Sequence, residues 1–138
     1  LGKISGPLLD RIDIHIEVTP VPFEKLSETR KAESSVEIRK RVTTARNVQT
    51  QRFDTYNHIH YNAQMSSKLI REYCALDDVS LQLLKTAMER LNLSARAYDR
   101  ILKVSRTIAD LENSENVFSH HIAEAIQYRS LDREGWLG

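Results

Sequence analysis

Apolar residues recur at helical spacing through most of the chain beyond residue 33, and this pattern limits the fold more than any other sequence feature. Ser34 followed by Glu37 has the spacing of a capping box and predicts a helix over about 35–53. Further helices are expected over the ranges 66–74, 79–91, 95–112 and 120–129. The last three are expected to be capped by Asp77 or Asp78, by Ser94 and by Ser119. The expected fold is mainly α, a bundle of about five helices.

The first part of the chain has a different pattern. Residues 12–18 alternate apolar and polar with period two, which predicts a half-buried β-strand. Pro20 and Pro22 follow and end any regular element, because proline lacks a backbone donor and restricts its neighbour. A single strand has no ladder partner, and the chain begins at Leu1 rather than at a methionine. We therefore expect the chain to be a piece of a longer protein.

Composition gives few further clues to the function. The net charge is +1, from 20 basic and 19 acidic residues, so the overall charge does not indicate a nucleic-acid or membrane partner. Cys74 is the single cysteine, which excludes an internal disulfide. No apolar run approaches the roughly 20 residues of a membrane-spanning helix. We expect a cytoplasmic protein with no membrane contact.

One motif places an arginine at a chemically suggestive position. The segment from Ser5 to Asp13 is Ser-Gly-Pro-Leu-Leu-Asp-Arg-Ile-Asp, and Arg11 precedes the predicted strand. One interpretation is a surface arginine paired with Asp10 or Asp13. The other is an arginine held rigidly for a partner, because a planar, permanently charged guanidinium suits a transferring phosphoryl group. A bare Asp-Arg pair alone favours the first interpretation.

A second motif lies at the start of the helix expected over 95–112. With Ser94 as the cap, Arg96 falls in the first turn, where a cation opposes the helix dipole at a cost of a few tenths of a kcal/mol. Such a placement suggests a function, for example meeting an anion at the same helix end. The alternative is that Arg96 pairs with a nearby acid, and its position alone does not decide between the two.

These motifs resemble one family. The segment from Ser5 to Val18 resembles the end of the ATPase core in magnesium chelatase-like AAA+ proteins, and residues 93–111 resemble their lid. Residues 121–133, His-Ile-Ala-Glu-Ala-Ile-Gln-Tyr-Arg and then Leu-Asp-Arg after one residue, resemble the closing segment of the ComM/YifB-type branch. The resemblance implies that residues 1–22 end an AAA+ core and that residues 23–138 form a C-terminal helical lid domain.

The same resemblance implies a mechanism for the full-length protein. Arg11 matches the arginine finger, the catalytic residue that reaches into the neighbouring subunit's site. Arg96 matches the sensor-2 arginine, which would touch the γ-phosphate of nucleotide held by its own subunit. The full-length protein is then expected to use ATP and Mg²⁺ in a homo-oligomeric ring, a hexamer. The implied work is remodelling of DNA as a helicase or branch-migration motor.

Two other functions remain open at this stage. One is a chelatase-type motor that drives metal insertion through a partner protein. The other is a stand-alone helix-turn-helix DNA binder, in which the helices on either side of Asn92 and Leu93 form the motif and Arg96 and Arg100 contact DNA. The near-neutral net charge argues against this last function.

The chain itself lacks the residues that hold ATP phosphates. A phosphate loop requires the pattern G-x-x-x-x-G-K-[ST], whose backbone amides and lysine surround the phosphates. The chain has four glycines, and its one Gly-Lys pair, Gly2-Lys3, is followed by Ile4 and preceded by no such loop. We therefore expect this chain alone to be no ATPase and to need no cofactor.

Two further groups of side chains suggest contacts with a ligand or partner. The helix over 35–53 carries one acid, Glu37, and five cations: Arg39, Lys40, Arg41, Arg46 and Arg52. This excess is either a solvated helix face or a surface that contacts DNA or a neighbouring subunit. The histidine pairs 58/60 and 120/121 lack the cysteine pattern of a zinc site, and we expect no metal.

Overall fold

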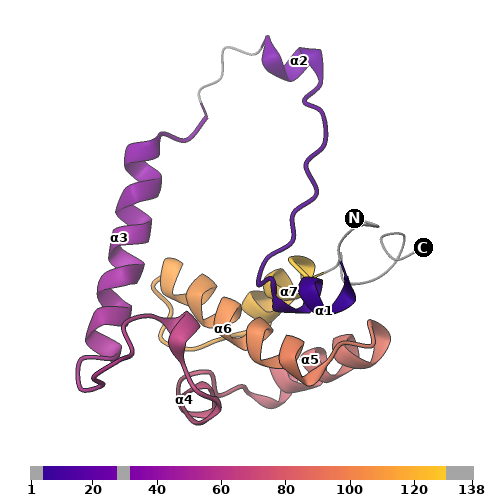
Figure 1. The fold of residues 1–138 in the computed structure, drawn as a ribbon. Coiled ribbons are helices and arrows are strands. Elements are labelled where there is room, and N and C mark those ends of the chain that lie inside the picture. Colours follow the sequence, from indigo (N-terminus) through magenta and orange to yellow (C-terminus); the bar gives the residue numbers. More distant parts are fainter. Residues whose placement is uncertain (1–4, 28–31, 130–138) are drawn as a thin grey trace.

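The protein is seen in a computed structural model that describes residues 5–27 and 32–129. These two ranges contain helices and no strand, so the mainly α fold is confirmed (Figure 1). The elements are α1 Gly6–Arg11, α2 Phe23–Leu26, α3 Ser35–Arg52, the 3₁₀ helix η1 Asn62–Gln64, α4 Ser67–Tyr73, α5 Asp78–Arg90, α6 Ala95–Leu111 and α7 Ser119–Gln127.

Helix α6 is the centre of the bundle. Helices α7, α3, η1, α4 and α1 all contact it, and α5 packs against α7 (Figure 1). Ile101 and Leu102 of α6 are buried in one hydrophobic core that also contains Leu84 of α5 and Ile122 of α7. Burial of each of these side chains stabilises the fold by about 1.5–3 kcal/mol. The position of α6 therefore depends on the helices packed around it.

Side-chain caps start four of the helices at or within one residue of the expected positions, because each cap satisfies a backbone N–H that the helix leaves unpaired. The cap bonds are Glu37 N to Ser34 (3.3 Å), Leu69 N to Ser66 (3.4 Å), Ser80 N to Asp77 (2.7 Å) and Ala97 N to Ser94 (3.1 Å). The bonds from Ser80 hold the pKa of the Asp77 carboxyl below its usual value.

The predicted start of the last helix was wrong by one residue. Ser119 is the first residue of α7 rather than its cap, and Phe118 occupies the cap position. The Phe118 N–H donates to Nδ1 of His121, 2.9 Å away. An imidazole therefore takes the part that a Glu or Gln side chain has in a capping box, so the usual sequence pattern of that motif does not identify this helix start.

The predicted strand over residues 12–18 was also wrong. The segment is extended but pairs with no strand in the described ranges, and Ile14, Ile16 and Val18 are 45%, 66% and 88% exposed. A strand requires a ladder of backbone bonds. The segment is instead attached to the end of α7 by a 2.6 Å bond from His15 N–H to the Tyr128 carbonyl.

Short helices flank this extended segment, and the sequence prediction missed both. In α1, Ser5 accepts the Leu8 N–H at 3.2 Å and Pro7 lies in the first turn, a combination that could have identified the helix. Beyond residue 22 the chain reaches α2, which buries no residue and lies away from the bundle (Figure 1). None of the helices in the described ranges has the length and hydropathy to cross a membrane.

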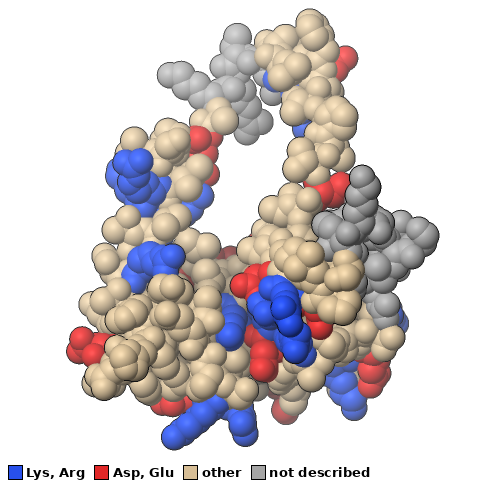
Figure 2. Space-filling view, in the orientation of Figure 1, with Lys and Arg blue, Asp and Glu red and all other residues tan. Residues whose placement is uncertain are grey.

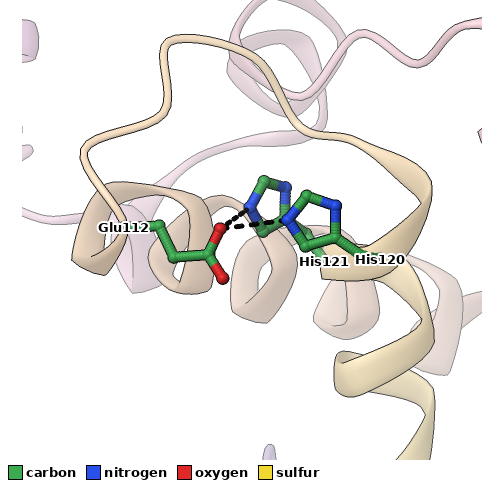
Figure 3. A group of neighbouring side chains, drawn as sticks. All are labelled: Glu112, His120 and His121. Atoms are coloured by element: carbon green, nitrogen blue, oxygen red, sulfur yellow. Dashed lines mark hydrogen bonds and ion pairs between the residues drawn. The ribbon is translucent and has the colours of Figure 1, made fainter.

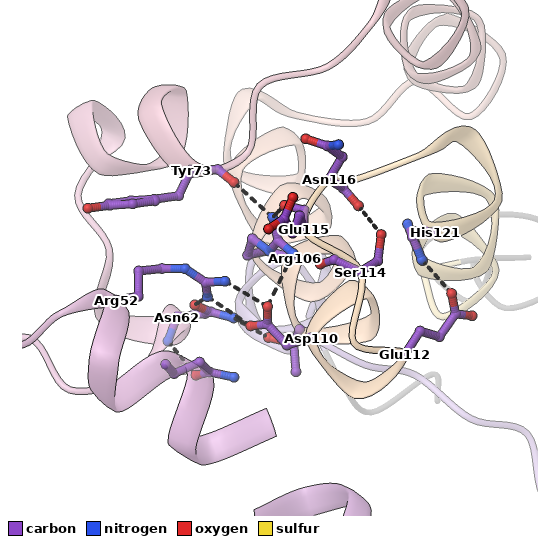
Figure 4. Close-up of polar contacts among 12 residues, drawn as sticks. Arg52, Asn62, Tyr73, Arg106, Asp110, Glu112, Ser114, Glu115, Asn116 and His121 are labelled. Carbon is purple, nitrogen blue, oxygen red and sulfur yellow. Dashed lines mark hydrogen bonds and ion pairs between the residues drawn. The ribbon is translucent and has the colours of Figure 1, made fainter. Parts of the chain in front are cut away.

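A buried ionic network joins α3, η1 and α6. The Asp110 carboxylate, whose side chain has no exposed surface, accepts two bonds from Arg52 at 2.7 and 2.8 Å and one from Asn62 at 2.8 Å (Figure 4). Arg106 lies 3.2 Å away and also donates to the carbonyls of Ser114 and Glu115. The network thus fixes three elements and the turn after α6 around one charge.

A second polar cluster joins the end of α6 to the start of α7. Nε2 of His121 lies 2.7 Å from Oε2 of Glu112, and Nε2 of His120 lies 3.0 Å from the same oxygen (Figure 3). Because Nδ1 of His121 accepts the Phe118 N–H, the proton of the neutral ring is on Nε2 and donates to Glu112. Bonds from His120 and His121 hold the pKa of Glu112 below its usual value.

Asp110→Ala should lower the free energy of unfolding by about 3–5 kcal/mol, because it leaves two buried guanidinium groups without their anion. Urea unfolding followed by circular dichroism measures the loss. Asp54→Ala, which removes an exposed acid, is the control and should change stability by about 0.5 kcal/mol or less. A loss below about 1 kcal/mol for Asp110→Ala would contradict the role given to the network.

The Glu112 cluster should make stability depend on pH in acid. A carboxyl with a lowered folded pKa contributes stability above its unfolded pKa, near 4.5, and loses it as the pH falls through the folded value. Glu112→Gln should therefore be less stable than the parent at neutral pH, and the gap should close in acid. Glu115→Gln, in the following turn, is the control. A gap that is as large in acid as at neutral pH would disprove this assignment.

Candidate functional site

Arg11 is the last residue of α1 and its side chain is exposed. The backbone around it is held from the other end of the chain. Arg129, which follows α7, donates to the carbonyl oxygen of Ile12 and, at 3.3 Å, to that of Asp10. Nε2 of His15 lies 3.0 Å from the Leu9 carbonyl oxygen. Arg11 therefore projects into solvent from a segment fixed on both of its sides.

The acids next to Arg11 have other partners. The Asp10 carboxylate accepts from the Ser94 hydroxyl at 2.8 and 3.0 Å, and Asp13 forms an ion pair with Arg100 at 2.5 Å. The interpretation of Arg11 as a surface arginine neutralised by its neighbours thus finds no support in these contacts.

Arg96 lies in the first turn of α6 and is exposed. The anion at this helix end is the carboxylate of Asp10. The Ser94 hydroxyl donates to Asp10 and accepts the Ala97 N–H, so α1 is joined directly to the α6 cap. A carboxylate at a helix amino end is favourable by a few tenths of a kcal/mol to about 1 kcal/mol. Through this contact the structure brings the segments that carry Arg11 and Arg96 together.

Sequence analysis missed Asp10 and Arg129 as parts of this arrangement. Arg129 has no exposed side-chain surface, and its bond to Asp10 spans 119 residues of sequence. Arginines are usually exposed, and nothing in the local pattern around Arg129 marks it as buried. The only signal for it was its place in the closing segment of the resemblance.

The basic residues of α3 do not share one environment. Arg39, Lys40, Arg41 and Arg46 are exposed, and blue side chains gather over α3 in Figure 2. Lys40 is near Glu37, Arg41 pairs with Glu33, and the Arg46 guanidinium lies 4.9 Å from the Tyr61 ring centre. Arg52 instead belongs to the buried Asp110 network, so it does not face solvent with the others.

Glu112, His120 and His121 are close enough to hold a metal ion, with their ligand atoms within 4.8 Å of one another (Figure 3). The hydrogen bonds do not suit one. A metal on Nε2 of His121 would require the proton on Nδ1, and that proton would then face the N–H of Phe118. The cluster is accounted for as the junction of α6 and α7.

Cys74 is the other candidate for reactive chemistry. Its thiol lies buried in the core, and burial raises its pKa to about 12. At neutral pH it stays a thiol rather than a thiolate nucleophile or metal ligand.

The chain is similar to one protein family and to several known proteins. Residues 32–129 match the family described as magnesium chelatase, subunit ChlI C-terminal. The competence protein ComM of Haemophilus influenzae is 42% identical over 96% of the chain. The YifB proteins of Escherichia coli and Salmonella typhimurium are 40% and 38% identical over the same share.

The chain covers only part of these relatives. It spans 25% of the length of the Haemophilus ComM protein and 26% of each YifB protein. The matched family residues run from just before α3 to the buried Arg129, and the relatives also cover the α1 segment. The chain therefore belongs to the family of magnesium chelatase-like C-terminal domains, in its ComM/YifB-type branch.

Proposed function

We propose that this chain is the lid-and-finger part of a ring-forming AAA+ ATPase that couples ATP hydrolysis to remodelling of DNA. The observation that carries the proposal is the exposure of Arg11 and Arg96 on two segments that the Asp10–Ser94 contact joins. Two exposed guanidinium groups on rigid supports suit the phosphates of a nucleotide.

The rest of the nucleotide site must come from outside this chain. The sequence holds no phosphate-loop pattern, so ATP and Mg²⁺ would be bound by the other part of a protein of the relatives' length. We take Arg11 to be a finger that acts in trans, on nucleotide bound by another subunit. A homo-oligomeric ring, which we take to be a hexamer, provides that arrangement, because a head-to-tail interface repeats until the ring closes.

DNA is the proposed substrate for two reasons. The Haemophilus relative is named a competence protein, and the exposed cations of α3 suit a polyanion. Arg39, Thr43 and Arg46 follow one another at spacings of four and three residues, so they form one stripe along α3. The one acid within α3, Glu37, lies off this stripe and near Lys40.

The other functions have less support. A stand-alone helix-turn-helix protein would need the second helix of the pair, α6, to enter a DNA groove. Nine residues of α6 are buried, and Arg100 pairs with Asp13, so α6 is the core helix of the bundle. A metal-insertion motor stays as the alternative, and ATPase activity that DNA does not stimulate would favour it.

The finger is tested in the full-length ring. Arg11→Ala should lower ATP turnover on the order of 10³-fold or more, and Arg11→Lys should restore it only in part, because an ammonium lacks the planar fork. Substitution of the phosphate-loop lysine, which lies in the part of the full-length protein outside this chain, should abolish turnover to the same extent. When the two inactive proteins are mixed, activity should return wherever an intact finger faces an intact loop. Mixed rings that form but stay inactive would show that Arg11 does not act between subunits.

The α3 stripe is tested by the salt dependence of DNA binding. Arg39→Ala with Arg46→Ala should weaken binding of the full-length protein to DNA and reduce the slope of log affinity against log salt by about 2, about one for each lost phosphate contact. Fluorescence anisotropy measures both quantities. Arg90→Ala, an exposed arginine of α5, is the control. An unchanged slope in the double variant would exclude the stripe as a DNA contact.

A further inference from the structure

The lid holds the backbone of the Arg11 segment on both sides of the finger. Arg129 donates to the carbonyl oxygens of Asp10 and Ile12, the residues that bracket Arg11 in the chain. A guanidinium can serve two acceptors at once because its donors point in fixed directions. With its side chain fully enclosed, Arg129 has little freedom to leave this position.

The second link runs from the finger segment to the amino end of α6. One oxygen of Asp10 lies 2.8 Å from the Ser94 hydroxyl, and that hydroxyl also caps α6 by accepting the Ala97 N–H. Asp10 is one residue before the finger, and Ser94 is two residues before the sensor arginine, Arg96. The route from Arg96 to Arg11 therefore consists of the backbone from Arg96 to Ser94, the Ser94–Asp10 hydrogen bond and the backbone from Asp10 to Arg11. A displacement of the first turn of α6 is expected to move Arg11 along this route.

Further contacts oppose rotation of this unit. Arg100, one turn further along α6, pairs with Asp13, and the His15 N–H donates to the Tyr128 carbonyl at the end of α7. Leu9, on the inner side of α1, is buried. The segment from Leu9 to His15, which carries Arg11, is thus bonded to α6 through Asp10 and Asp13. It is bonded to the end of α7 through Arg129 and through the Tyr128 carbonyl.

We propose that Asp10 and Arg129 are positioning residues that hold the Arg11 finger on the amino end of the Arg96 helix. The finger and the sensor arginine of one subunit then move as a single unit, so a change at one nucleotide contact repositions the other. This inference rests on the proposed ATPase function and adds to it the route that connects the two arginines.

The test uses full-length rings with Asp10→Ala and Arg129→Lys. The first removes the link to Ser94, and the second keeps the positive charge but not the two-carbonyl geometry. Each should lower ATP turnover about 10- to 100-fold, because a displacement near 1 Å can cost that much. Ser94→Ala loses both the cap and the Asp10 contact, whereas Ser66→Ala loses only the equivalent cap of α4. Ser94→Ala should lower ATP turnover by about as much as Asp10→Ala does, whereas Ser66→Ala should leave ATP turnover near that of the parent.

Mixing distinguishes a positioning role from a folding role. An Asp10→Ala subunit has a misplaced finger and an intact nucleotide site, so it should regain activity with the phosphate-loop lysine variant. It should regain none with Arg11→Ala, because neither subunit then offers a working finger. A general folding defect would give no such dependence on the partner. Recovery with both partners, or with neither, overturns the inference.

The result also separates this inference from the proposed function. If Arg11→Ala is inactive while Asp10→Ala and Arg129→Lys turn over within twofold of the parent, the positioning role is wrong and the finger stands. If Arg11→Ala turns over at the parent rate, both the finger and its positioning are wrong.

Discussion

The buried charge of Asp110 is the interaction on which the rest of this structure depends. Its carboxylate binds Arg52 of α3, Asn62 of η1 and Arg106 of its own helix, and the environment has almost no access to water. A buried ion is tolerated only where its partners satisfy it, which requires α3, η1 and α6 to adopt one relative placement. Arg106 extends the constraint to the turn after α6 through the Ser114 and Glu115 carbonyls.

This constraint fixes the position of α6, whose two ends make different contacts. Its carboxyl end is fixed by the Asp110 network and by the Glu112 junction with α7. Its amino end presents Arg96 and binds Asp10 of the α1 segment. Under the proposed function, a central helix held at both ends would carry a displacement of its amino end to the elements packed around it, because close-packed interiors transmit strain.

Sequence reasoning found five helices from local signals, although it missed α1 despite the local signals of Ser5 and Pro7. Ser34, Asp77 and Ser94 each bind a backbone N–H three residues away, so their caps could be predicted from a short stretch of sequence. The strand over 12–18 failed for the opposite reason. Its alternation is real, but a strand exists only with a partner, and the described residues contain none.

At the candidate site, too, residues in local sequence motifs were predicted, and residues defined by long-range contacts were not. Arg11 and Arg96 were identified through motifs, and the structure exposes both. Arg52 could not be separated from its exposed neighbours on α3, because its partner Asp110 lies 58 residues away. The contacts of Arg129 span still longer separations, up to 119 residues, and no local rule assigns a buried arginine to a particular carbonyl. The family resemblance thus pointed to Arg11 and Arg96, whereas neither it nor the physical patterns identified the contacts that hold their backbone segments in place.

The most direct test of the central claim is the structure of the full-length ring, determined by cryo-electron microscopy with a slowly hydrolysed ATP analogue. The account predicts the Arg11 guanidinium within about 3 Å of the γ-phosphate held by the neighbouring subunit, a hydrogen-bond distance. It also predicts α1 still bound to the amino end of α6 through Asp10 and Ser94. A ring in which Arg11 reaches no nucleotide, or in which α1 is separated from α6, would contradict it.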